Sequence, residues 1–261
     1  MAEPMLLLAI AGGALVGFSL SLVGGGGSIL AVPILVYVVG IRDPHLAIGT
    51  SAVGVAANAL IGLVGKARAG LVKWHCGLVF AAAGVAGAAL GSIAGKAIDG
   101  HALLALFAGL MILVGVLMLR RGESHGNPDV ALGRENATKL VTFGFGTGLL
   151  SGFFGIGGGF LIVPGLIAAT GMPIFNAMAT SLLAVTSFGV TTATSYALSE
   201  LIDWPIAGAF IGGGLIGTVG GGRLAAHLST RRGALTRLFA ALIFAVAVYM
   251  LWQSLPAIGL A

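Results

Sequence analysis

The sequence predicts an all-α polytopic membrane protein in which one fold unit occurs twice. Of the 261 residues, 58% are hydrophobic and only 8% are charged, which leaves too little polar surface to solvate an ordinary globular domain. Apolar runs such as 103–119 and 238–255 approach the roughly 20 residues that carry a helix across about 30 Å of hydrocarbon. The alternating strands of an outer-membrane barrel, with turns about every 10 residues, are absent.

An internal duplication is the second observation, and it appears when the sequence is aligned with itself. The stretch GFSLSLVGGGGSILAVPIL, which begins at Gly17, returns as GTGLLSGFFGIGGGFLIVPGL, which begins at Gly146. We therefore expect a first transmembrane repeat at 1–119, a polar cytoplasmic linker at 120–139 and a second transmembrane repeat at 140–261. Further matches join Gly49–Ser51 to Ala179–Ser181 and Trp74 to Trp204.

Each repeat contains five apolar segments in the same order, which gives about 8 to 10 membrane segments. The first segment ends at a run of glycines. The second holds only about 12 residues, or about 18 Å as a helix, so it is too short to cross alone and is either re-entrant or interrupted. The third carries most of the polar side chains, the fourth has glycines spaced for helix packing, and the fifth is an apolar run. The segments are 6–23, 28–40, 46–64, 76–95 and 103–119, then 140–155, 160–170, 176–197, 205–222 and 238–255.

The distribution of basic residues predicts that the two repeats have inverted topology. Cytoplasmic loops of membrane proteins carry an excess of Lys and Arg. If the first two segments contribute an even number of crossings and the linker is cytoplasmic, 11 basic residues lie inside and only Arg42 and Lys96 lie outside. A single broken crossing would divide the same residues 7 to 6. The inverted arrangement is favoured, and it places both termini on the extracytoplasmic side.

The glycine runs at 24–27 and 155–159 interrupt membrane segments at matching positions. Inverted repeats with segments interrupted by glycine or proline are typical of secondary transporters, whose substrate site lies near the midplane. The first amides of a helix lack partners within the helix and carry partial positive charge, so they attract anions. The predicted substrate-binding residues are Gly24, Gly25, Gly26, Gly27, Ser28, Gly155, Gly157, Gly158 and Gly159, with Pro33 and Pro164 as structural breaks.

Polar side chains in the third segments are the other candidates for binding the substrate. Ser51 and Asn58 are seven residues apart and share a helix face, and hydroxyl and amide groups donate hydrogen bonds to oxyanions. Such hydroxyls also commonly bond back to their own helix, which leaves a structural role open for the stripe that includes Thr191. All eight carboxylates lie in predicted loops, which argues against an ion pump with an intramembrane carboxylate. The candidates are Thr50, Ser51, Asn58, Thr180 and Ser181.

No catalytic, metal or cofactor site is predicted from the sequence. Cys76 is the only cysteine, so the chain has no CxxC motif and no intrachain disulfide. The five histidines fall in or beside loops without ligand spacing, and no nucleophile elbow, HExxH or Walker motif occurs. The formal net charge of +5 is explained by membrane topology rather than by nucleic-acid binding. No cleaved signal peptide is expected, because no basic n-region precedes the first apolar stretch.

The doubled glycine motif resembles that of the TauE/SafE family of sulfite exporter-like permeases, G-x-x-S-G-x-x-G-x-G-G-G-x-x-x-V-P-x-L. The first copy departs from it at Leu20, Ser21 and Ser28. The resemblance covers nearly the full chain and implies export of small sulfur-containing anions, such as sulfite or organosulfonates, across a prokaryotic cytoplasmic membrane. The second copy matches at Gly148, Ser151, Gly152, Gly155, Gly157, Gly158, Gly159, Val163, Pro164 and Leu166, and the first at Gly17, Gly24, Gly26, Gly27, Val32, Pro33 and Leu35.

These patterns together favour a secondary transporter, not an enzyme, that exports a small sulfur-containing anion by alternating access. A passive anion channel, a non-catalytic membrane subunit of a larger complex, and a redox or enzymatic subunit with a ligand at the glycine turns stay open as alternatives. The expected partners are the anionic substrate and membrane lipid, without nucleic acid, and a homo-oligomer is left open. The expected location is the prokaryotic inner membrane.

Overall fold

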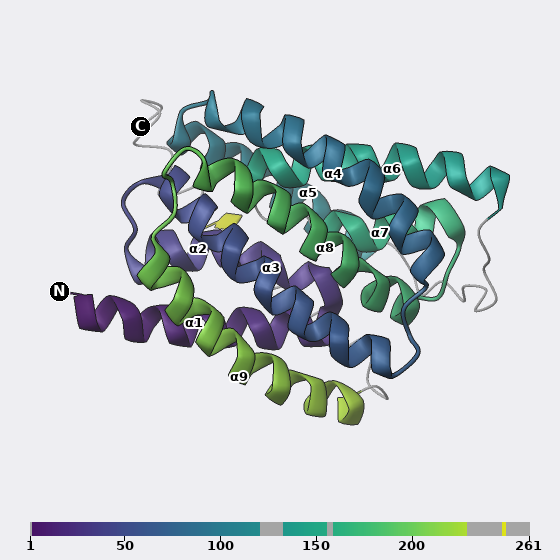
Figure 1. Ribbon diagram of the computed structural model, residues 1–261, viewed down its shortest axis with the longest axis horizontal. Coiled ribbons are helices and arrows are strands. Elements are labelled where there is room, and N and C mark those ends of the chain that lie inside the picture. Colours follow the sequence, from purple (N-terminus) through teal and green to yellow (C-terminus); the bar gives the residue numbers. More distant parts are fainter. Residues whose placement is uncertain (1, 121–132, 156–158, 229–246, 249–261) are drawn as a thin grey trace.

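The computed structural model describes residues 2–120, 133–155, 159–228 and 247–248, and all regular structure within these ranges is helical (Figure 1). This confirms the predicted all-α class for the described part of the chain. The elements are α1 (Ala2–Val23), the 3₁₀ helix η1 (Gly24–Leu30), α2 (Ala31–Pro33), the π-helix η2 (Ile34–Val39), α3 (Pro44–Arg68), α4 (Trp74–Lys96), α5 (Gly100–Arg120), α6 (Arg134–Phe154), α7 (Gly159–Thr170), α8 (Ile174–Ala197) and α9 (Trp204–Leu228).

Five stretches of the described residues are long and apolar enough to cross a bilayer, which confirms the predicted class of membrane protein. Some of their apolar side chains point outward: Ile93 is 63% and Ile216 69% exposed, as expected for a surface that contacts lipid. The predicted segment 238–255 lies outside the described residues apart from 247–248. The five stretches are Glu3–Val39, Pro44–Arg68, Trp74–Lys96, Ile174–Ala197 and Trp204–Gly221.

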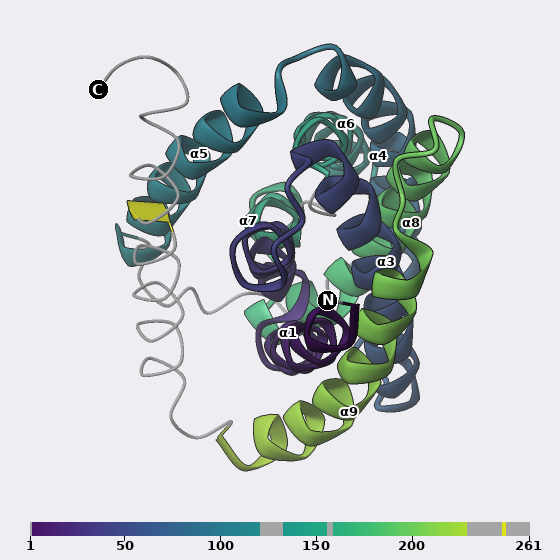
Figure 2. The same cartoon turned by 90° about the vertical axis from the view of Figure 1, so that its left-hand side faces the viewer.

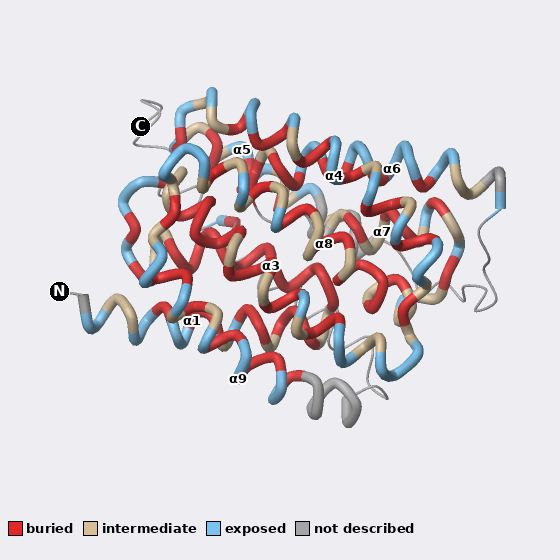
Figure 3. The backbone as a smooth tube through the Cα atoms, viewed as in Figure 1, coloured by how far each residue is buried: buried red, intermediate tan, exposed pale blue. Residues whose placement is uncertain are grey.

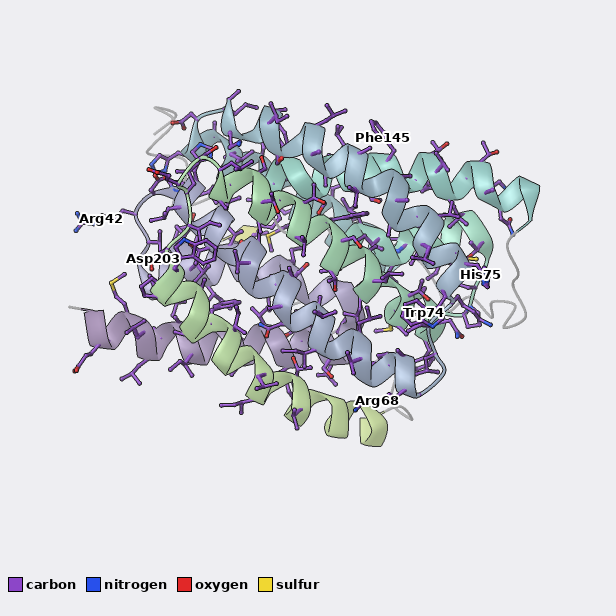
Figure 4. The ribbon with its side chains drawn as sticks, viewed as in Figure 1. Arg42, Arg68, Trp74, His75, Phe145 and Asp203 are labelled. Atoms are coloured by element: carbon purple, nitrogen blue, oxygen red, sulfur yellow. The ribbon has the colours of Figure 1, made fainter. Side chains whose placement is uncertain are left out.

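The chain turns back after α1, and the returning segment (residues 24–39) packs along α1. The apolar stretch Glu3–Val39 has 37 residues, and as one straight helix it would extend about 56 Å, nearly twice the thickness of the hydrocarbon. Instead, Gly27 lies directly against the backbone of Leu20. The N-terminus and the connection that contains Arg42 therefore lie at the same end of the molecule (Figures 1 and 4).

The returning segment differs from the short helix predicted at 28–40. Helical turns begin already at Gly24, and the segment is a 3₁₀ helix up to Leu30 and a π-helix over Ile34–Val39. Pro33 lies between these two parts. Proline has no N–H, and its ring clashes with the carbonyl group four residues earlier, so a regular α-helix does not continue through this position.

The second half forms a similar hairpin from α6 and α7. α6 begins at Arg134, inside the predicted linker, because 134–139 contains no proline or glycine that would stop a helix. α6 ends at Gly155, and α7 packs against it with Pro164 in its interior. Residues 134–139 of the predicted linker therefore belong to α6.

Two closely packed helix pairs accompany the hairpins. α1 packs along α9, and α4 packs along α6. In both pairs glycines bring the helix backbones together: Gly17 lies against Gly214, and Gly148 lies against Gly84. Small residues permit this close approach. The matching helices α3 and α8 run in opposite directions, and so do α4 and α9 (Figure 1).

The returning segment and α7 occupy the interior of the helical assembly. In the end view they lie between α3, α4 and α8 on one side and α5 on the other (Figure 2). Every residue of η1 is buried, and buried residues concentrate on the inner faces of the helices (red in Figure 3). The backbone of the first glycine run is therefore enclosed by protein.

Candidate functional site

Two glycines in the left-handed backbone conformation mark the two hairpin turns. Gly24 has φ 68° and Gly155 has φ 67°, a region that residues with a Cβ rarely adopt. A Cβ at Gly24 would meet the carbonyl oxygen of Met178 in α8, and a Cβ at Gly155 would meet the Ile48 side chain in α3. Each turn thus lies against the third helix of the other repeat. The two hairpins also touch each other, because η1 contacts α7.

Ser51 and Ser181, the two predicted serines of the third segments, bind to the glycine turns across the repeats. The amide of Gly25 donates to Ser181 Oγ at 3.0 Å, and Ser51 Oγ lies 3.4 Å from Gly155 O, to which it donates. Ser51 also donates to Ile48 O in its own helix at 2.8 Å, and Ser181 donates likewise to Met178 O at 2.8 Å. The structure therefore brings Ser51 and Ser181 together with the glycine turns.

The two predicted threonines hold neighbouring connections instead. The amide of Asp203 donates to Thr50 Oγ1 at 2.9 Å, and the amide of Lys73 donates to Thr180 Oγ1 at 2.9 Å. Both threonines are fully buried. Their hydroxyls fix the chain immediately before α9 and α4, so each repeat anchors a connection of the other.

Asn58 is the predicted polar residue whose buried side-chain amide has no hydrogen-bond partner in the described part of the chain. It is 0% exposed, its side chain lies against Gly214 of α9, and neither Oδ1 nor Nδ2 has a hydrogen-bond partner among the described residues. A buried amide without partners costs about 1–3 kcal/mol. The matching residue of the second repeat is Phe188, which lies against Gly84, so this polar position belongs to the first repeat alone.

The structure narrows the set of amides at the first turn that a ligand could use. In a 3₁₀ helix each amide after the first few bonds to a carbonyl three residues earlier, so η1 itself uses most of them. The amide of Gly25 is taken by Ser181, and the Ser28 hydroxyl donates to Gly25 O at 2.9 Å. Gly157 and Gly158 lie outside the described residues, and Gly159 begins α7.

The hydroxyl stripe of α8 bonds to its own helix, which is the structural alternative that the sequence left open. A groove of about 330 Å³ between α3 and α8 is lined by two of these hydroxyls and by mostly apolar side chains. In this structure these hydroxyls donate to their own helix and not into the groove. The bonds run from Thr186 to Leu182 O, Ser187 to Leu183 O, Thr191 to Ser187 O and Thr194 to Val190 O, at 2.7–3.0 Å.

Four further buried polar atoms have no partner among the described residues, and their residues are not among the predicted substrate-binding residues. The atoms are His45 Nδ1, Ser151 Oγ, Thr192 Oγ1 and Tyr196 Oη. Ser151 belongs to the glycine motif, which is the one signal that points to it. The burial of the other three depends on helix packing, which composition does not reveal.

As far as the structure describes it, the interior around the turns contains no charged side chain. Within the described ranges, none of the buried residues is Lys, Arg, Asp or Glu, and no group of three or more His, Cys, Asp or Glu residues is arranged to hold a metal ion. At the molecular surface, Asp99 accepts hydrogen bonds from the amides of Ala102 and His101 at 3.0 Å each. Chiefly the Ala102 bond, together with the His101 bond, holds the pKa of the Asp99 carboxyl below its usual value.

Comparison with known proteins identifies one family. The sequence model of the family described as "Sulfite exporter TauE/SafE" matches residues 9–250. No solved structure matches the chain.

Several curated proteins are similar along most of their length. A "Probable membrane transporter protein" of Xylella fastidiosa is 49% identical over 255 residues, which cover 95% of this chain and 96% of that protein. The "Probable membrane transporter protein MJ0441" of Methanocaldococcus jannaschii is 31% identical over 71% of this chain and 70% of its own. "Probable membrane transporter protein YunE" of Bacillus subtilis is 25% identical over 81% and 84%.

Proposed function

The chain belongs to the TauE/SafE family and is a membrane transporter, and from this premise we propose that it is a secondary transporter of a small sulfur-containing anion. Sulfite or an organosulfonate is the proposed substrate, export the proposed direction, and alternating access the proposed mechanism. The observation that carries the proposal is the pair of buried glycine turns, one at Gly24 and Gly25 and one at Gly155, in which Gly25 and Gly155 are each bonded to a serine of the other repeat.

The chemistry of the two turns supports an anionic substrate. Backbone amides at a helix start carry partial positive charge and bind oxyanions, and glycine lets a ligand approach the backbone. Ser51 and Ser181 add hydroxyl donors, which reorient from their present acceptors when an anion binds. The described part of the interior has no buried carboxylate that would repel the anion. Asn58 supplies a further amide along the path, since its polar atoms have no other partner in the described part.

The arrangement of the helices supports alternating access by two inverted repeats. Matching helices run in opposite directions (Figure 1), and matching contacts recur in both halves: Thr50 holds the connection before α9 as Thr180 holds the one before α4. In transporters of this kind, one repeat rocks against the other around a fixed central site. The exchanged hydrogen bonds lie where such rocking would break and remake contacts.

The charges at the two ends support an orientation with the N-terminus outside. Arg68, Trp74 and His75 lie at one end of the molecule, and Arg42 and Asp203 lie at the other (Figure 4). The end with Arg68 also contains the connection before α4 with Lys73. Under the positive-inside rule, we propose that this end faces the cytoplasm of a prokaryotic cell and that the N-terminus is extracytoplasmic.

Uptake of radiolabelled sulfite into liposomes that contain only this chain tests the proposal. We expect saturable uptake that sulfonates inhibit and chloride does not. A flux that does not saturate with substrate concentration would indicate a passive channel and not a carrier. Absence of uptake for every anion tested, in protein shown to be folded, would overturn the proposal and favour a subunit of a larger complex.

Variants at the serines test the site itself. Ser51→Ala and Ser181→Ala are expected to raise the KM for the anion or abolish uptake, because each removes a hydroxyl at a glycine turn. Ser92→Ala is the matched control: Ser92 is equally buried, but it donates only to Ala89 O of its own helix at 2.9 Å. If all three variants transport alike, the turns are not the binding site.

A further inference from the structure

A half-buried histidine and a buried tyrosine near the end of the molecule that contains the N-terminus present polar atoms without partners among the described residues. His45 begins α3, Tyr196 ends α8, and their ring centroids are 6.5 Å apart. Tyr196 is 0% exposed, and neither its hydroxyl nor His45 Nδ1 has a hydrogen-bond partner among the described residues. A buried polar group without a partner is costly. Two such atoms on neighbouring rings therefore point to a ligand more strongly than one would.

The hydrogen bond of the other ring nitrogen of His45, Nε2, determines whether Nδ1 carries a hydrogen. Nε2 lies 3.1 Å from Ile98 O, and a carbonyl oxygen only accepts, so Nε2 carries a hydrogen. In the neutral ring Nδ1 is then an acceptor with a free lone pair. The Tyr196 hydroxyl is not bonded to Nδ1 in this structure, but after a small rotation of the rings it is able to donate to this lone pair or to accept from a protonated Nδ1. The pair therefore accommodates a His45 that either lacks or carries an additional proton.

The pair joins the two repeats. His45 belongs to the first repeat and Tyr196 to the second, and one turn beyond His45 the backbone of Gly49 lies directly against Leu201 and Tyr196. Lys96 of α4 also contacts this region, at the end of α8. Its ammonium group lies 5.6 Å from the centroid of the Tyr196 ring and donates to Ser195 O and Ser199 Oγ at 2.9 Å each.

Carboxylates outnumber cations at this end of the molecule. Asp43 accepts from the amide of His45 at 2.8 Å, and His45 also lies close enough to Asp99 to act on its carboxylate. His101 is the other titratable group in the α4–α5 connection. The described segments of this end are the start of α1, the end of α4 and the connections before α3, α5 and α9, and their cations are Arg42 and Lys96, while their carboxylates are Glu3, Asp43, Asp99, Glu200 and Asp203.

We propose that His45 and Tyr196 form a proton-binding site through which one proton accompanies each anion across the membrane. The inference rests on the proposed function and adds its energy coupling. The lone pair of Nδ1 holds the proton, and the imidazolium donates through Nδ1 to Tyr196 and through Nε2 to Ile98 O. During export the proton leaves Nδ1 for an extracytoplasmic water molecule, which becomes a hydronium ion, and the reverse transfer accompanies uptake. The positive charge of the imidazolium offsets the carboxylates that an anion meets at this end.

Coupling follows from reciprocity between the two binding events. If the proton on His45 strengthens binding of the anion, the anion strengthens binding of the proton by the same factor. With one proton per anion, a gradient of one pH unit supports about tenfold accumulation at equilibrium. Acid outside therefore drives anion uptake into the vesicle lumen, and acid in the lumen drives export.

The test measures sulfite accumulation in liposomes with a pH gradient while the membrane potential is held at zero. The wild-type chain should accumulate the anion about tenfold per pH unit. His45→Gln keeps a side-chain amide for Ile98 O but lacks the titrating ring, so it should equilibrate the anion without accumulation. Tyr196→Phe should shift the pH of half-maximal transport to more acidic values, because the imidazolium loses its acceptor.

His101→Gln, which makes the same substitution at the same end, serves as the control and should accumulate the anion like the wild type. Wild-type uptake without dependence on the gradient, or accumulation that survives in His45→Gln, would overturn the proton site and leave the proposed function standing. If no anion is transported at all, the proposed function fails. The proton site is then tested by measuring the thermal unfolding temperature between pH 5 and 8. If that temperature depends on pH equally in the wild type, His45→Gln and Tyr196→Phe, the proton site is overturned.

Discussion

Replacing Gly24 by alanine isolates the role of the first turn, because the chain offers a nearly ideal control. Gly24 and Gly70 both have φ 68°, so an alanine at either position is strained by about 1–2 kcal/mol in the left-handed region. At Gly70 the added Cβ meets nothing within 4 Å, whereas at Gly24 it meets the backbone of Met178. Backbone atoms do not yield as a flexible side chain does.

The difference between the two variants measures how tightly the turn is held against α8. Overpacking of a filled interior costs about 1–3 kcal/mol, so Gly24→Ala should lose about 2–5 kcal/mol of unfolding free energy in total, against about 1–2 for Gly70→Ala. The displacement also separates Gly25 from Ser181. Transport should therefore fall strongly in Gly24→Ala and stay near the wild-type rate in Gly70→Ala.

Equilibrium unfolding in mixed detergent micelles and sulfite uptake by liposomes, each on both variants, provide the measurements. If Gly24→Ala and Gly70→Ala lose equal unfolding free energy, α8 moves without an energetic penalty to make room for the added Cβ. That result would refute the close packing of the turn. A Gly24→Ala protein that is destabilised but transports normally would separate the turn from the transport site.

Three further predictions concern other parts of the molecule. Gly217→Ala should destabilise the α1–α9 pair, since its Cβ meets the backbone of Ala14, whereas Gly220→Ala, with nothing within 4 Å, should not; thermal unfolding of both variants decides. Asn58→Leu should raise stability by up to about 1–3 kcal/mol, because it removes an unpartnered buried amide, and should reduce transport; unchanged transport would remove Asn58 from the path. Asp99 has a lowered pKa, so its capping of α5 is fully present above the unfolded-state pKa and is lost as the pH falls through the folded-state pKa. Amide exchange at the start of α5 should therefore accelerate at acid pH in the wild type and not in Asp99→Asn.

Local features of the sequence were enough to predict the membrane class, the helical segments and the two glycine turns. Helix ends were less accurate: α3 extends from Pro44 to Arg68, beyond the predicted 46–64. Apolar composition marks the part of a helix in hydrocarbon, while hydrogen bonding continues into polar residues at its ends. The helical form of the first glycine run was missed, because a glycine run that breaks an α-helix is still compatible with 3₁₀ turns.

The sequence by itself determined that serine and threonine hydroxyls gather in the third segments, and the tertiary structure alone decided which of them are buried and what each one bonds. Thr50 and Ser51 are adjacent, yet one holds the connection before α9 and the other holds the turn at Gly155. Successive side chains of an α-helix point about 100° apart, so neighbours in the sequence face different partners. Those partners come from segments more than 100 residues away. The same reason hid the neighbourhood of His45 and Tyr196, whose rings come together only because α3 packs against α8.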